Sequence, residues 1–152
     1  MTMLMGHSIS ECTTMNIKPG PHRSDADFFI LSPGGEGTVK SFTPSFYQEL
    51  DTEFNSFKGH LLVAQHSFDA DWPTWEMHPH GDEMVCLIEG DIDFVLWRDG
   101  EEEVLRVNEA GTYVVVPKGI WHTARPRQQT TMLFITPGEG TLNAVTPGGE
   151  PL

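Results

Sequence analysis

Two short clusters of histidine and acid constrain this chain more than any other feature of its sequence. The first reads His78-Pro-His80-Gly-Asp-Glu83, and the second ends at His122. Side chains two residues apart on a β-strand share a face, so His78 and His80 can present two imidazoles to one ion, which a helix does not allow at that spacing. Three histidines and one carboxylate suit a divalent transition metal and leave positions open for water or a substrate.

The period-two pattern leaves the carboxylate ligand open. In an unbroken strand Asp82, and not Glu83, shares the face of His78 and His80. A bulge or turn at Gly81 would bring Glu83 to that face instead.

The same alternation adds Glu76, which shares the face of His78 and His80 if the strand is regular before them. A carboxylate there can orient a ligand imidazole or act as a general base beside the ion. A solvated strand end is the equally weighted alternative. Glu76 is therefore our candidate catalytic residue.

The two clusters resemble the two motifs of the cupin superfamily. The first motif runs glycine, five residues, His-x-His, three or four residues, Glu, six residues and glycine. The second runs glycine, five residues, Pro-x-Gly, two residues, His, three residues and Asn. This chain matches the second motif from Gly111 to His122, and it matches the first at its two histidines, at Glu83 and at Gly90. The six-residue spacing to Gly90 favours Glu83 over Asp82.

Three positions depart from the motifs. Trp72 stands where the first glycine would be, only two residues separate His80 from Glu83, and Pro126 replaces the terminal asparagine. The resemblance implies His78, His80, Glu83 and His122 as metal ligands. By analogy with cupin dioxygenases, isomerases and decarboxylases, it favours Fe or Mn, with Ni or Zn as further options.

The resemblance covers roughly residues 58–137 and implies an all-β fold, a cupin-like double-stranded β-helix or jelly-roll barrel. We predict an N-terminal arm with one short helix packing on the barrel at 1–57, the barrel at 58–137, and a C-terminal arm at 138–152.

Short β-rich runs separated by turns also predict an antiparallel sandwich or barrel. The expected strands are 28–31, 60–68, 75–80, 83–89, 92–97, 102–107, 112–116, 122–125 and 132–136. From Thr43-Pro44 to Gly59, the apolar side chains Phe46, Leu50, Phe54 and Phe57 form one stripe, which predicts a helix covering a face of the barrel.

Composition restricts the partners. Nine Lys and Arg against 22 Asp and Glu give a net charge of −13, which repels phosphate backbones and anionic lipids, so we expect neither nucleic acid nor membrane as a partner. The chain shows no basic leader and no apolar run long enough to span a bilayer, and Cys12 and Cys86 do not suggest a disulfide framework. We therefore expect a cytoplasmic protein.

Two hypotheses for function follow. The first is a metal-dependent enzyme, dioxygenase-like, isomerase or decarboxylase, acting on a small oxygen-bearing substrate. That substrate would be anionic if Arg125 or Arg127 meets it, although surface salt bridges explain these arginines equally well. The second is a noncatalytic metal or small-molecule binding module such as a sensor.

The strand at 83–89 suggests how the chain assembles. If Glu83 faces inward, strict alternation sends Met84, Cys86 and Ile88 to the outer face of the sheet, where they need cover from the arms, the helix or a second subunit. Because cupins commonly dimerise through such a sheet, we predict a homodimer.

Overall fold

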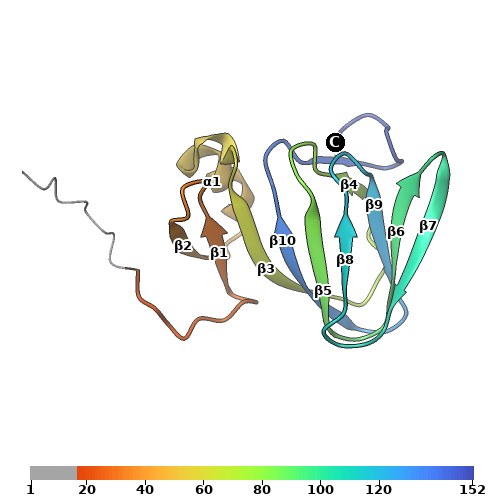
Figure 1. The fold of residues 1–152 in the computed structure, drawn as a ribbon, viewed down its shortest axis with the longest axis horizontal. Coiled ribbons are helices and arrows are strands. Elements are labelled where there is room, and N and C mark those ends of the chain that lie inside the picture. The colour runs from red at the N-terminus through yellow and green to blue at the C-terminus, as the bar shows by residue number, and fades with distance from the viewer. Residues whose placement is uncertain (1–16) are drawn as a thin grey trace, which may run out of the picture.

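The computed structural model describes residues 17–152; Cys12 lies outside the described residues. Two antiparallel sheets pack against each other (Figure 1), a six-stranded sheet in the order β2-β1-β3-β10-β5-β8 and a five-stranded sheet in the order β11-β4-β9-β6-β7. The strands are β1 (Asp27–Leu31), β2 (Gly37–Ser41), β3 (Leu61–Phe68), β4 (Trp75–Met77), β5 (Glu83–Glu89), β6 (Ile92–Arg98), β7 (Glu101–Val107), β8 (Tyr113–Val116), β9 (His122–Pro126), β10 (Thr130–Thr136) and β11 (Leu142–Ala144). The predicted all-β fold is confirmed.

The main core lies between the two sheets. Val85 and Phe134 of the six-stranded sheet pack with Ile92, Phe94 and Ala124 of the five-stranded sheet in one buried apolar cluster. In β5 and β10, alternate side chains point into this layer, as expected when a sheet buries one face.

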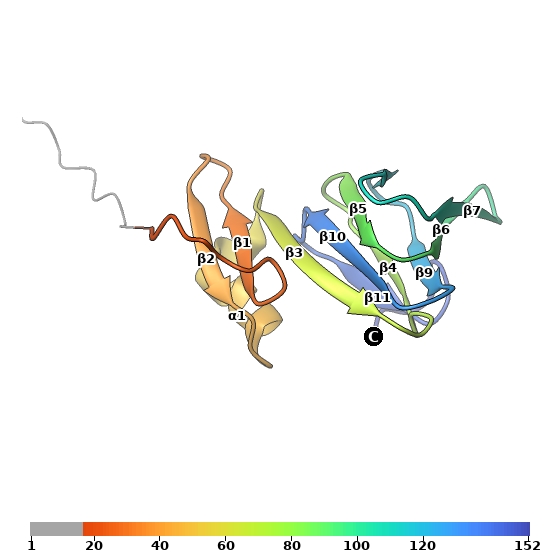
Figure 2. The same cartoon turned by 90° about the horizontal axis from the view of Figure 1, so that it is seen from below.

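Residues 27–41 are part of the larger sheet. β1, which matches the strand expected over 28–31, pairs with β2 and β3, so the sheet continues into the segment expected to be an arm. β2 was not predicted. Helix α1 (Phe46–Glu53) lies against this end of the sheet (Figure 2) and buries Phe46 and Leu50 in a second apolar cluster with Phe28.

The predicted helix ends early. Residues 55–57, which form the short 3-10 helix η1 (Asn55–Phe57), all have positive φ values, a backbone conformation that breaks an α-helix. Phe57 is nevertheless buried in the second cluster, so the apolar stripe is satisfied by a turn and not by a continued helix.

Two differences in the chain around β4 matter for the site. β4 ends at Met77, so the strand expected over 75–80 is wrong in its second half, because Pro79 and His80 form a turn. β11, in the segment expected to be a surface arm, pairs with β4 and sets Asn143 opposite Glu76. Within residues 17–152, no helix is long and apolar enough to cross a bilayer.

Candidate metal centre

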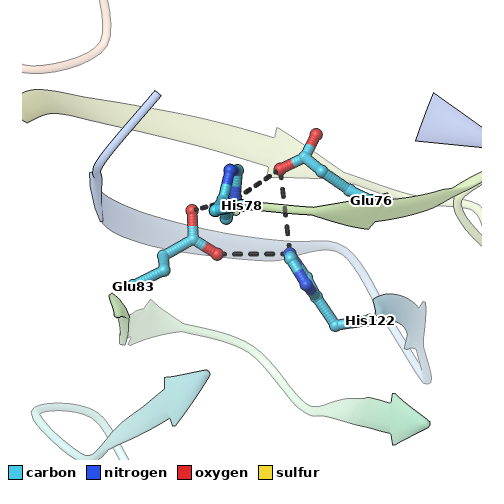
Figure 3. A group of neighbouring side chains, drawn as sticks. All are labelled: Glu76, His78, Glu83 and His122. Atoms are coloured by element: carbon cyan, nitrogen blue, oxygen red, sulfur yellow. Dashed lines mark ion pairs between the residues drawn. The ribbon is translucent and has the colours of Figure 1, made fainter. Parts of the chain in front are cut away.

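Four side chains from both sheets meet at one end of the main core. Glu76 lies on β4, His78 follows that strand, Glu83 begins β5, and His122 begins β9 (Figure 3). Glu76 and His122 are paired neighbours in the five-stranded sheet, whereas Glu83 comes from the six-stranded sheet. The cluster therefore depends on the packing of the two sheets.

The four groups form a closed ring in which carboxylates and imidazoles alternate (Figure 3). His78 Nε2 lies 3.0 Å from Glu76 Oε1 and 3.1 Å from Glu83 Oε2. His122 Nε2 lies 3.3 Å from Glu83 Oε1 and 3.7 Å from Glu76 Oε1. Two ligand atoms about 2.1 Å from one ion, at about 90–110° to each other, lie roughly 3.0–3.4 Å apart. Three of the four distances lie in this range, and the distance from His122 Nε2 to Glu76 Oε1 is slightly longer, so the ring is close to the dimensions of a coordination sphere.

Three atoms of the ring are buried and have no hydrogen-bond partner within residues 17–152, although each lies at ion-pair distance from a neighbour in the ring. His78, Glu83 and His122 are almost completely buried, and among the described residues no hydrogen bond of good geometry reaches His78 Nε2, Glu83 Oε1 or His122 Nε2. Unsatisfied buried polar atoms are costly, and several aimed at one point mark a place for a cation. Glu76 is the most exposed of the four, with 29% of its side chain accessible.

Hydrogen bonds behind the ring fix the orientation of its side chains. The Thr141 hydroxyl donates to the Gly138 carbonyl and lies 2.8 Å from His78 Nδ1, so it accepts the proton on that nitrogen. His122 Nδ1 lies 3.2 Å from the Ile120 carbonyl, to which it donates. In both histidines, Nε2 is left as the atom that faces the centre. Such outer contacts raise ligand basicity and hold the tautomer.

Behind Glu83, the Thr136 hydroxyl donates to Oε2 at 2.6 Å. Neither Thr136 nor Thr141 was predicted from the sequence. Each belongs to a strand or loop that reaches the site through long-range pairing, and no local pattern marks it.

Electrostatics within the ring favour charged groups. Burial raises the pKa of Glu76, but the contacts with His122 and His78 outweigh it and lower that pKa to about 2. Burial lowers the pKa of each imidazole, but Glu76 and Glu83 raise the pKa of His78 to about 9 and that of His122 to about 9. The pKa of Glu83 is also lowered, because the same imidazoles outweigh its burial. In the metal-free protein two imidazolium ions face two carboxylates.

His80 is not brought into the ring. Its side chain is 54% exposed, and its Nε2 lies 4.0 Å from Glu139 Oε1 on the surface. The turn after Met77 removes His80 from the strand face that it was expected to share with His78. The spacing also allows a different alignment. Glu76-x-His78, four residues, Glu83, six residues and Gly90 has the spacing of the first motif from its first histidine onward, with Glu76 in place of that histidine and Ala70 in place of the first glycine.

The choice between the two acids follows from the same turn. Glu83 enters the ring, whereas Asp82 is exposed and accepts a hydrogen bond from the Lys118 backbone N–H at 2.7 Å. A Cβ on Gly81 would lie 2.8 Å from Pro137, so the turn packs where only glycine fits.

A cavity of about 760 Å³ opens beside the ring, between the barrel core and α1. Glu76, His78 and Glu83 line it, together with aromatic side chains. Arg125 and Arg127 do not line it, and they pair with Glu102 and Asp93.

A scan of family models and a search of curated proteins found no match for this chain. Among solved structures, it is similar to a cupin-2 domain protein from Shewanella frigidimarina, with 22% identity over 51% of this chain and 70% of that one and a TM-score of 0.44. It is also similar to oxalate oxidase (18% identity, 53% of this chain and 44% of that one, TM-score 0.46) and to Fe(II)-HppE with the alternative substrate (S)-1-HPP (13%, 50% and 42%, TM-score 0.43).

These likenesses concern the fold alone, and the chain spans less than half of oxalate oxidase and of HppE. The closer indications come from the chain itself. The first motif contributes His78 and Glu83 to the ring, and the second contributes His122. Glu83 and His122 begin strands of the two different sheets. The described residues form two packed antiparallel sheets, and the chain is similar to the cupin-2 domain protein named above, which is consistent with the cupin-like fold expected from the sequence.

Proposed function

We propose that Glu76, His78, Glu83 and His122 bind one divalent transition metal ion, and that the chain is an enzyme acting on a small oxygen-bearing organic molecule held in the adjacent cavity. The observation that carries the proposal is the group of three buried atoms without hydrogen-bond partners in the described part of the chain, His78 Nε2, Glu83 Oε1 and His122 Nε2, which lie close together beside that cavity. A dioxygenase-like reaction is the activity we propose first.

The donor set supports Fe or Mn. Imidazole suits Fe, Ni and Zn, whereas carboxylate suits Mn and harder ions, so an equal mixture favours the metals that accept both. When bound, such an ion supplies a Lewis-acid centre with open positions that polarises a substrate oxygen.

Glu76 has a further role in the proposal. Only its Oε1 contacts the imidazoles of the ring, and the residue lines the cavity. Its low pKa keeps it ionised at neutral pH. The second oxygen can therefore accept a hydrogen bond from a bound molecule, but a carboxyl group with so low a pKa is a weak base, so the role we propose for Glu76 is to orient that molecule and the imidazoles rather than the general-base role expected from the sequence.

Metal titration tests the proposal. We expect the metal-free chain to bind Fe(II) or Mn(II) under anaerobic conditions at about one ion per chain, because the ring offers four donors. Elemental analysis and calorimetry measure the stoichiometry. Absence of binding by both ions would refute the metal centre, and absence of oxygen uptake by the Fe-loaded protein across a substrate panel would favour the noncatalytic alternative.

We also propose a homodimer through the outer face of the six-stranded sheet. The register sets apolar side chains side by side across neighbouring strands, from Phe29 through Val63, Ile135 and Met84 to Val115. An apolar row of this length on an open sheet face is typical of an interface.

Val115→Asp and Val104→Asp make a matched test of the dimer, because both valines are 51% exposed but lie on different sheets. We expect light scattering to give twice the 17.0 kDa of one chain for the wild type. Val115→Asp should shift the mass toward the monomer, since a carboxylate in an apolar interface lacks a partner, whereas Val104→Asp should not. A wild-type mass of one chain would refute the dimer.

A further inference from the structure

The cavity beside the ring has an unbalanced charge. None of the nine Lys and Arg of the chain lines it, whereas three exposed aspartates do: Asp51, Asp69 and Asp71. His66 also lines the cavity, and burial lowers its pKa despite the charge of Glu76, which disfavours the charged imidazole. The charge of Asp71 raises the pKa of Arg125, but both terminal nitrogens of Arg125 already donate hydrogen bonds to Glu102 at 2.8 and 2.9 Å.

The metal centre does not supply the missing positive charge. Two carboxylates and one divalent ion sum to a formal charge of zero. The ligand set expected from the sequence, with His80 in place of Glu76, has only one carboxylate. With a divalent ion it would have a net charge of +1, which could attract an anion. The carboxylate of Glu76, itself on the cavity wall, therefore changes the kind of ligand that the site attracts.

The rest of the wall is aromatic. Phe68, Trp72 and Phe134 contact one another, with ring centroids 5.3–6.0 Å apart, and all three line the cavity along with Tyr47 and Phe57. Aromatic faces bury apolar groups and attract cations such as ammonium.

We infer that this cavity binds an organic amine, a cationic group on an apolar or aromatic body, and selects against anions. The inference deepens the proposed function and rests on it only for the ion. The aspartates attract the ammonium, the aromatic wall packs against the body, and the neutral centre attracts a competing carboxylate less than a centre with a net positive charge would.

Three probes of similar size and different charge test the inference on the full chain loaded with Mn(II): 2-phenylethylamine, 2-phenylethanol and 3-phenylpropionate. We expect calorimetry to give the amine at least about tenfold tighter binding than the carboxylate, a difference of about 1.4 kcal/mol. The alcohol should lie between them.

Variants separate the contributions. Asp51→Asn combined with Asp69→Asn should weaken the amine severalfold and leave the alcohol unchanged, while Asp99→Asn, in the exposed turn between β6 and β7, should change neither. Glu76→His should shift preference toward the carboxylate probe, because the loaded centre gains a positive charge.

The outcomes distinguish the two proposals when metal content is measured on the same samples. If the protein holds one ion per chain but binds the carboxylate as tightly as the amine or more tightly, the amine assignment alone is overturned. With the same metal content, equal binding of amine and alcohol, or no binding by any probe, would also overturn it. Failure to load metal, with the amine preference intact, would overturn the proposed metal centre alone.

Discussion

His78→Ala should lower the affinity for Fe(II) or Mn(II) by more than about 100-fold, whereas His80→Ala should leave it unchanged. Losing a group that only supports a ligand typically costs about 10–100-fold, and losing the ligand itself costs more. His78 Nε2 lies at 3.0 and 3.1 Å from both carboxylates of the ring, while His80 is exposed at the surface. Calorimetric titration of metal-free protein measures the difference.

The acids give a second matched pair. Glu83→Gln keeps the shape of the side chain but removes a charge from the ring, so it should weaken metal binding strongly, whereas Asp82→Asn alters an exposed group that contacts the Lys118 backbone. Circular dichroism should show that all four variants remain folded. Loss of binding in both His78→Ala and His80→Ala would mean that the histidine pair expected on one strand face holds the ion, whereas unchanged binding in His78→Ala would refute the ring.

The strands were predictable where local pattern and burial agree. In β5, Glu83, Val85 and Leu87 are buried and Ile88 is exposed, as the alternation requires. A strand with one face on a core has its register fixed by that face, so period-two counting is reliable inside it.

Counting failed where the strand ended. His80 is only two residues from His78, but the Pro79 turn lies between the end of β4 and the start of β5, and alternation has no meaning across a turn. Glu76 was found because it precedes the turn, although its assigned role was that of a catalytic neighbour and not of a ring member. Aligning the motif on Glu76-x-His78 would have restored the usual gap to Glu83.

The contribution of the C-terminal segment could not be read locally. β11 has three residues, and it forms because β4 offers an open edge for pairing. Thr141, one residue before it, reaches His78 only through that long-range contact. The Gly and Pro residues around this segment predict a loop, and the backbone on either side of β11 is indeed a loop.

Metal-free and metal-loaded protein should respond to pH in opposite ways. His78 and His122 have pKa values raised from the ordinary 6.5 to about 9, so the stability they contribute to metal-free protein is fully present below about pH 6.5 and is lost as pH rises through about 9. Glu76 has its pKa lowered from 4.5 to about 2, so its contribution is present above about pH 4.5 and is lost as pH falls through about 2. Metal-free protein should therefore be most stable between about pH 4.5 and 6.5.

A bound ion reverses the alkaline side of this profile. The imidazoles must lose their protons to bind metal, so protons compete with the ion and its stabilising effect grows as pH rises. One pKa unit corresponds to about 1.4 kcal/mol, and 1 kcal/mol shifts Tm by roughly 2–4 °C in a chain of this size. Between about pH 6 and pH 9 we expect the Tm of metal-free protein to fall by at least about 5 °C relative to the loaded protein.

Thermal unfolding followed by circular dichroism, with and without saturating Mn(II) across this pH range, gives the slope of Tm against pH for the loaded and the metal-free protein. A His78→Gln variant serves as the control, because without the imidazolium the alkaline loss in metal-free protein should shrink. Parallel slopes in loaded and metal-free wild type would show that the ion and the protons do not share these imidazoles. That result would place any bound metal elsewhere. If instead the Tm of loaded and metal-free wild type diverges above about pH 6.5, and the difference shrinks in the variant, the ion binds at the ring. The reason is that an ion and a proton exclude each other only when they share a donor atom.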